Sequence, residues 1–169
     1  MKKSDINQAP NYFDTYLNKV EDIELMDALK QSISELDNLD LEALEKKADY
    51  AYAEGKWTIK DIFQHIIDTE RIMSYRALTF ARNDDTQLPG FDENLYAQNV
   101  STKKRSLRSL ILELKLVHKS SMAMFKSFDK KALKRKGIMF KSEIAVLAVG
   151  FIIAGHQKHH LQVIKERYL

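Results

Sequence analysis

The feature that most restricts the fold is the scarcity of residues that interrupt helices. The chain has only two prolines and five glycines in 169 residues. Proline ends or kinks a helix and glycine weakens one, so this scarcity favours long helices. No stretch alternates apolar and polar residues between turn residues, and we therefore expect no strands. The length is typical of one domain, and we treat residues 1–169 as a single domain with one core.

The spacing of apolar residues predicts four long helices. The first is expected over about Tyr12–Leu36, and the second over about Trp57–Ala81. The third is expected to follow Ser101 as its capping residue, and the last to run from near Ser142 to the C-terminus. Four helices of this length predict an all-α four-helix bundle. Ligand and metal sites in bundles are built from inward-facing side chains on facing helices.

Two features of the second helix and its following segment refine this prediction. Thr58 is a candidate N-cap, and Asp61 lies three residues later, where a capping box needs its partner. The segment 83–100 shows no clear periodicity and is predicted as a loop. Such a long loop is unusual in a compact domain and often has a function.

Composition argues against several classes of protein. The formal net charge is only +3, so the total indicates no nucleic-acid partner, and we interpret the local basic clusters as solvated helix faces. There is no cysteine, which excludes disulfides and zinc–thiolate sites and favours a reducing cytoplasm. The N-terminus lacks the apolar region of a signal peptide, and no segment reaches the roughly 18 apolar residues of a membrane span. We therefore expect a cytoplasmic protein with neither a membrane nor a nucleic acid as partner.

Three of the five histidines follow directly after an apolar run, Ala148–Ala154. On a helical wheel, His156 and His160 lie one turn apart near the middle of the apolar face, and His159 lies at its edge. Burying an imidazole donor or acceptor without a partner costs about 1–3 kcal/mol. A divalent metal would be such a partner, because H-x₃-H directs two nitrogens to one point. Backbone carbonyls, waters or carboxylates are the alternative partners.

The other two histidines are less clearly placed. His65 lies at the flank of the apolar face of the second helix, beside Thr58, Thr69 and Arg76 on the wheel. This polar strip could line a cavity, and a histidine half in water is the alternative. His118 lies at the margin of the third helix's core face, among lysines, and we predict that it lies on the surface.

Gly150 and Gly155 lie within the last predicted helix, where each costs about 1 kcal/mol relative to alanine. Close approach of a neighbouring helix would explain both glycines without any chemical role.

Three stretches together resemble one known family. WTIKDIFQHIIDTER, at Trp57–Arg71, is similar to the second-helix signature of the DinB/YfiT-like superfamily. LPGFDEN, at Leu88–Asn94, resembles the following loop in one branch, and GHQKHH, at Gly155–His160, resembles the motif of the last helix. The resemblance extends from about residue 10 to the end of the chain. It implies a four-helix bundle of up-down-down-up type with a long loop between its second and third helices.

The resemblance also implies a metal centre. In the family, one histidine from the second helix and two from the last hold a metal, and these correspond to His65, His156 and His160. The implied ion is a divalent transition metal, with Zn or Ni foremost. Members often form homodimers. Characterised relatives are transferases or isomerases that use small thiols such as bacillithiol or mycothiol, others are described as metal-dependent hydrolases, and many have no known activity.

The expected function is therefore that of a metal-dependent small-molecule transferase or hydrolase, with a low-molecular-weight thiol as one candidate co-substrate. Three neutral nitrogens leave an open coordination position, which could hold a water with its pKa lowered to about 7 or a thiolate. Arg76 could bind a substrate carboxylate or pair with a neighbouring helix, and His159 could act as a base or face solvent. Asp92, Glu93 and Tyr96 could border the pocket. The alternative is a non-catalytic bundle that binds a metal or small ligand, or that has lost its metal.

Overall fold

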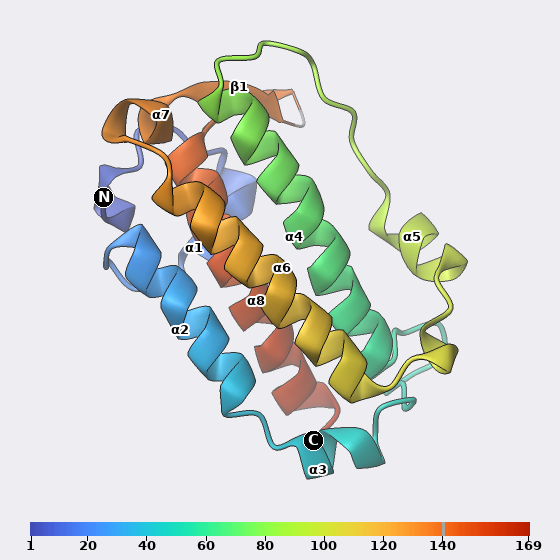
Figure 1. Ribbon diagram of the computed structural model, residues 1–169. Helices are drawn as coiled ribbons and strands as arrows, with labels where there is room; N and C mark the ends of the chain where they lie inside the picture. Colours follow the sequence, from blue (N-terminus) through green and yellow to red (C-terminus); the bar gives the residue numbers. More distant parts are fainter. Residues whose placement is uncertain (140) are drawn as a thin grey trace.

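The computed structural model describes residues 1–139 and 141–169, and it is mostly helical, as the sequence predicts (Figure 1). The α-helices are α1 (Asp14–Leu17), α2 (Leu25–Asp37), α3 (Leu41–Lys46), α4 (Ile59–Ala81), α5 (Glu93–Asn99), α6 (Leu107–Lys126), α7 (Lys130–Lys134) and α8 (Val146–Arg167). The other described elements are strands β1 (Lys136–Met139) and β2 (Ser142–Ala145) and the 3-10 turns Lys3–Asp5, Asn11–Phe13 and Thr102–Lys104.

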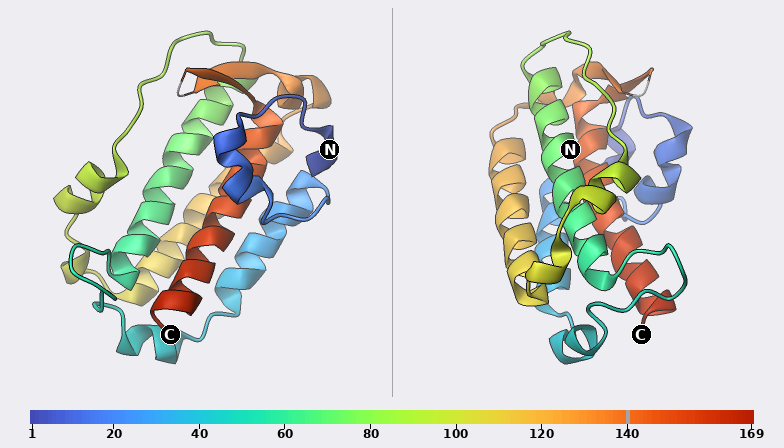
Figure 2. Two further views of the ribbon diagram at one scale, coloured as in Figure 1. Left: turned by 180° about the vertical axis from the view of Figure 1, so that it is seen from behind. Right: turned by 90° about the vertical axis from the view of Figure 1, so that its right-hand side faces the viewer.

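Helices α2, α4, α6 and α8 lie side by side and form a bundle (Figures 1 and 2). Helices α4 and α2 each pack against both α6 and α8. Asp61 in the first turn of α4 accepts a hydrogen bond of 2.5 Å from the hydroxyl of Thr102, just before α6, so these two helices begin at the same end of the bundle. No helix in the described part of the chain is both long and apolar enough to span a membrane.

The start of α4 agrees with the sequence prediction. The hydroxyl of Thr58 accepts a hydrogen bond of 3.1 Å from the Asp61 amide, and the Asp61 carboxylate accepts one of 3.0 Å from the Thr58 amide. These reciprocal bonds form the predicted capping box. They fix where α4 begins, and with it the direction in which the side chains of its first two turns point.

The buried core consists of two apolar clusters with a polar layer between them. One cluster joins the second half of α4 to α7, the strands and the first half of α8, and the other joins the first half of α4 to α3, α6 and the end of α8. Between the clusters, each of the four long helices contributes buried polar side chains: Ser32, Thr69, Glu70, His118, His156 and Gln157. Buried polar groups need partners, so this layer is where specific contacts are required.

His118 belongs to this polar layer, and the prediction that it lies on the surface is wrong. Its side chain is 0% exposed. Its Nδ1 lies 3.0 Å from a carboxylate oxygen of Glu70 in α4, and its Nε2 lies 2.9 Å from the carbonyl oxygen of Leu29 in α2. Both ring nitrogens therefore have partners from other helices, and these partners make burial of the imidazole possible.

The predicted first helix, Tyr12–Leu36, is wrong because the chain turns between α1 and α2. Glu24, just before α2, has an extended backbone and pairs with Lys2 in an isolated antiparallel bridge. The Ser4 amide donates a hydrogen bond of 2.8 Å to the Asp22 side chain. The N-terminal residues thus lie against the segment between α1 and α2 and stabilise its turn (Figure 2). Helical periodicity in the sequence cannot reveal such contacts.

Two other predicted helix starts are too early. The last helix begins at Val146, because Ser142 is the first residue of β2, which pairs antiparallel with β1. The prediction of no strands is therefore also wrong; each strand has only four residues, too few to show a clear alternation. The third helix is capped by Ser106 rather than Ser101, and the Ser106 hydroxyl accepts a bond of 3.1 Å from the Ser109 amide.

The segment 83–100 contains one helix that the sequence did not predict, α5. Asp92 caps it, because its carboxylate accepts hydrogen bonds from the amides of Asn94 and Leu95, at 2.9 Å and 3.0 Å. No residue of α5 is buried, and the Leu95 side chain is 54% exposed. The helix lies against the outside of α4 (Figure 2).

Candidate metal centre

Three histidines from two helices meet in the polar layer. His65 lies in α4, and His156 and His160 lie one turn apart in α8. The Nε2 atom of His156 is 3.0 Å from Nε2 of His65 and 3.1 Å from Nε2 of His160. One nitrogen from each of the three rings lies within 4.8 Å of the other two. The structure therefore brings together the three residues that the family resemblance implies as ligands, and we call them the histidine triad.

Burial keeps the triad in its neutral form. His156 is only 5% exposed, and burial lowers its pKa well below the usual value of 6.5, with the neighbouring histidines acting in the same direction. Burial, followed by the nearby His159, lowers the pKa of His65 to about 4. Burial, followed by His65 and His159, lowers the pKa of His160 to about 3. All three rings are therefore neutral near pH 7, and a neutral ring offers a lone pair to a metal.

The geometry of the triad is suited to one metal ion. Zn–N bonds of about 2.0–2.1 Å in a tetrahedral site place the ligand nitrogens about 3.3 Å apart. The two short Nε2–Nε2 distances, 3.0 Å and 3.1 Å, are close to this spacing. Without an ion, these nitrogens have only each other as hydrogen-bond partners at the point where they converge, as far as the described residues show. The residues present therefore fit a divalent metal with three nitrogen ligands.

Two aromatic side chains hold the triad in place, and neither was predicted from the sequence as part of the site. The Trp57 ring lies against the His65 ring with centroids 4.7 Å apart, and the Tyr16 ring lies against His156 at 5.2 Å. Gly155 permits the second contact, because a Cβ atom there would lie 2.1 Å from the carbonyl oxygen of Tyr16. The glycine in the GHQKHH stretch is therefore the one feature of the sequence that indicates a closely packed neighbour at this position.

A cavity of about 210 Å³ opens beside the triad. Its other lining residues are Phe13, Tyr16, Trp57, Thr69, Met73, Phe91, Glu93 and Ile152. The Thr69 hydroxyl is buried and has no hydrogen-bond partner among the described residues, so it is available to a bound molecule. Tyr16 and Glu93 both line this cavity, and burial followed by the nearby Glu93 carboxylate raises the pKa of Tyr16. We call this space the Glu93 cavity.

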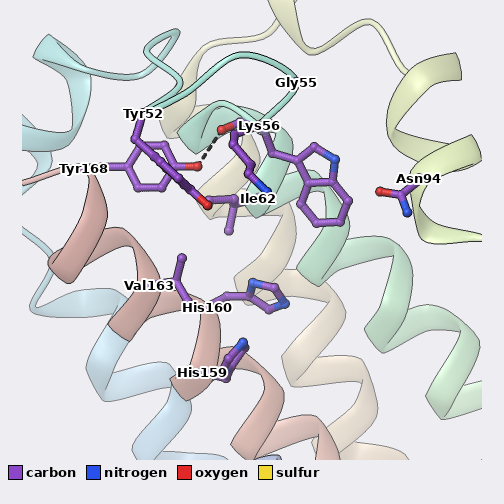
Figure 3. Close-up of a pocket in the computed structure, with 10 residues that line it drawn as sticks. Tyr52, Gly55, Lys56, Ile62, Asn94, His159, His160, Val163 and Tyr168 are labelled. Atoms are coloured by element: carbon purple, nitrogen blue, oxygen red, sulfur yellow. Dashed lines mark hydrogen bonds between the residues drawn. The ribbon is translucent and has the colours of Figure 1, made fainter.

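A second cavity, of about 280 Å³, lies on the other side of Trp57 and His160, which line both spaces. Figure 3 shows Lys56 on one side of it, Asn94 of α5 on another, and His159 and His160 of α8 below them. Tyr52, Gly55, Ile62, Val163 and Tyr168 complete its lining. We call this space the Lys56 cavity. The triad therefore lies where two solvent-accessible spaces meet.

The remaining candidate residues lie in different places. Arg76 is buried, lines neither cavity, and donates a hydrogen bond of 3.0 Å to the Pro89 carbonyl, so it holds the segment before α5. His159 is half-buried and lines the Lys56 cavity, with its ring 5.0 Å from that of His160. Of the residues in the long segment, Glu93 borders the triad's cavity, whereas Asp92 is the cap of α5.

Comparisons with known proteins bear on the family and the fold of the chain. Residues 24–164 match the DinB superfamily. The structure is similar to YfiT from Bacillus subtilis, with a TM-score of 0.70 and 15% sequence identity over 95% of this chain and 87% of that one. That protein is described as a probable metal-dependent hydrolase with an unusual four-helix bundle topology. At this identity the likeness establishes the fold. No curated protein sequence matches the chain.

Proposed function

The chain belongs to the DinB superfamily, and from this starting point we propose that it is a metal-dependent hydrolase of a small molecule. The observation that carries the proposal is the convergence of three imidazole nitrogens, from His65, His156 and His160, between two cavities. The likeness to YfiT, a probable metal-dependent hydrolase, supports the same class of reaction. We propose Zn or Ni as the metal, since both accept nitrogen ligands.

The nature of the ligands favours a catalytic site over a structural one. When bound, a metal with three neutral imidazole ligands supplies an open coordination position and its full positive charge, which acidify a water molecule or polarise a carbonyl. The chain contributes no cysteine that would close the site. Three ligands and two adjoining cavities leave room for a substrate next to the ion.

The surrounding residues have three tasks in this proposal. Trp57 and Tyr16 pack against the triad and keep its rings in one orientation. Met73 and Ile152 form an apolar wall that limits the access of water to the reacting groups. The Thr69 hydroxyl, which has no hydrogen-bond partner in the described part of the chain, can donate a hydrogen bond to a substrate oxygen or accept one from a substrate amide.

Metal analysis of the protein purified without a histidine tag tests the proposal. We expect about one Zn or Ni per chain in the wild type, and a loss of that metal in His65→Ala and His160→Ala. His159→Ala is the matched control, because it removes a neighbouring imidazole outside the triad and should keep the metal. A wild-type protein that takes up neither ion on titration would reject the metal centre.

A substrate screen then separates the possible activities. The metal-loaded protein is offered small esters, amides and activated amides, with and without a low-molecular-weight thiol. Hydrolysis that is lost in His160→Ala supports the proposal, whereas turnover that requires the thiol identifies a transferase instead. Full metal occupancy without turnover of any compound would favour a binding protein.

A further inference from the structure

The two cavities beside the triad differ in charge. Both are lined by Trp57 and His160, so each gives access to the same group of imidazoles. Glu93 is the acidic residue that lines the first cavity, and Lys56 is the basic residue that lines the second, while neither cavity is lined by a described side chain of the opposite charge. A molecule that occupies both spaces therefore meets a carboxylate at one end and an ammonium group at the other.

The Glu93 cavity has the chemistry of a site for a cation. Aromatic rings of Tyr16, Trp57 and Phe91 line it together with the carboxylate. Aromatic faces and a carboxylate attract an ammonium group, and the attraction grows when water is displaced. No ion pair or hydrogen bond to the Glu93 carboxylate is found among residues 1–139 and 141–169, so it is available to a ligand. A cation bound near a divalent metal needs such an anion close by.

The Lys56 cavity has the chemistry of a site for an anion. Its lining combines the Lys56 ammonium group, the Tyr52 hydroxyl and the Asn94 amide, which are all hydrogen-bond donors (Figure 3). His159, on the same wall as His160, can donate as well. Glu93 and Asn94 are neighbours at the start of α5, so this one helix contributes to both cavities.

We propose that the site accepts a small substrate with a positively charged group in the Glu93 cavity, a negatively charged group in the Lys56 cavity, and the reacting bond at the triad between them. This inference rests on the proposed function and specifies its substrate class. At about 30 Å³ for a water-sized group, the cavities hold about seven and about nine such groups. A compound of the size of a dipeptide therefore fits across both.

Binding of four matched hydroxamates to the zinc-loaded protein tests this inference by calorimetry. Glycyl-N-hydroxyglycine has a metal-chelating N-hydroxyamide between an amine and a carboxylate. The glycyl N-hydroxy-N-methylamide lacks the carboxylate, acetyl-N-hydroxyglycine lacks the amine, and N-methylacetohydroxamic acid lacks both. We expect each charged end to strengthen binding about two- to fivefold, which is the range of an exposed ion pair or of an exposed cation over aromatic rings.

Two substitutions then assign each charge to its cavity. Glu93→Gln should remove the advantage of the amine alone, and Lys56→Gln should remove the advantage of the carboxylate alone. Both side chains are exposed, so the fold should be retained, and thermal unfolding checks this. Glu42→Gln and Lys130→Gln are the matched controls, because they remove the same charges elsewhere on the exposed surface.

The outcomes separate the inference from the proposed function. Equal affinity for all four hydroxamates, or an equal loss for all four in Glu93→Gln, would overturn the charge-separated site and leave the metal centre intact. Failure of even the uncharged hydroxamate to bind the zinc-loaded protein would reject the open coordination position, and with it both proposals. Charge preferences that respond separately to the two substitutions support the inference.

Discussion

The polar layer of the bundle contains two groups of imidazoles: His118, which is buried, and the triad, in which His156 is buried and His65 and His160 are half-buried. The nitrogens of the two groups have different partners. His118 has a carboxylate of Glu70 on one side and the carbonyl oxygen of Leu29 on the other. In the triad, the Nε2 atoms of His65 and His160 both point at Nε2 of His156. The fold thus satisfies one imidazole completely and leaves three others converging on each other.

This difference separates a structural site from a binding site. Each bond of His118 links α6 to another helix, so the residue contributes to how three helices pack. The triad has no carboxylate or carbonyl at the point of convergence among the described residues, and neutral imidazoles facing one another are poorly satisfied. At His118 the cost of burying an imidazole is offset by bonds that join helices, which stabilise the bundle. At the triad no such bonds offset it, and this favours the binding of a metal.

Removal of Glu70 should have the largest effect. Glu70→Ala leaves His118 buried with one nitrogen unpaired, and breaking a buried pair typically costs about 3–5 kcal/mol. We expect the free energy of unfolding of the metal-free protein, measured in urea, to fall by this amount. Glu42→Ala removes an exposed carboxylate paired with Lys46 and should cost under about 1 kcal/mol.

If the triad is a binding site, removal of one of its histidines should lower the free energy of unfolding less than removal of Glu70, under the same conditions. His65→Ala in the metal-free protein removes one of three mutually facing rings, and we expect a loss of under about 2 kcal/mol. An equal loss in His65→Ala and Glu70→Ala would contradict the division into a structural and a binding site.

Zinc should stabilise the protein through the triad alone. A ligand that binds only the folded state adds about 2.7 kcal/mol at a free concentration one hundred times its Kd. We expect this gain in the wild type and its loss in His160→Ala, measured as the shift of the urea midpoint with and without a chelator. The His118→Gln variant should keep the gain, since His118 makes its bonds elsewhere. A gain that disappears in His118→Gln would show that the two groups are coupled.

The two groups also differ in how far sequence could predict them. The positions of His156 and His160 follow from local geometry, because residues four apart share a helix face, and the capping box of α4 is local in the same sense. The ligand role of the triad remains a prediction, although the structure brings its three rings together. The burial of His118 depends on Glu70 from another helix, and a wheel of its own helix cannot show that partner.

The errors in the fold have the same origin. The turn between α1 and α2 is held by Lys2 and Ser4, which lie about twenty residues before their partners. Tyr16 and Trp57 join the site only because the folded chain places them against the triad. Long-range contacts of this kind leave little trace in periodicity, whereas a glycine such as Gly155 can indicate where one is needed.

Gly155→Ala should have an intermediate effect on stability and should also weaken zinc binding at the triad. The new methyl group would lie 2.1 Å from the carbonyl oxygen of Tyr16, so the backbone of α1 must move away. Overpacking of this kind costs about 1–3 kcal/mol, and the loss of the Tyr16 contact should also weaken zinc binding. In Gly150→Ala the methyl group meets the end of the Leu25 side chain, at 2.8 Å, and the Phe125 ring, at 3.0 Å. Neither residue contacts the triad, so zinc affinity should be unchanged. Equal losses of zinc affinity in both variants would refute a specific role for Gly155.

The smallest effect should be the pH dependence that His118 contributes. Burial acts to lower its pKa, but the bond to Glu70, together with the nearby Glu35 carboxylate and the Leu29 carbonyl, raises the pKa above its usual value. A raised pKa in the folded state stabilises the protein below the unfolded value of about 6.5, and this stabilisation is lost as pH rises through the folded pKa. The triad histidines, whose pKa values burial lowers, contribute with the opposite sign in the metal-free protein. The experiment compares the metal-free wild type with His118→Gln. Because the triad is common to both proteins, the difference in their unfolding free energies isolates the contribution of His118. We expect that difference to be largest below about pH 6.5 and to shrink as the pH rises. A difference that grows with pH would mean that His118 is neutral in the folded protein, and that the bond to Glu70 does not stabilise the protonated imidazole.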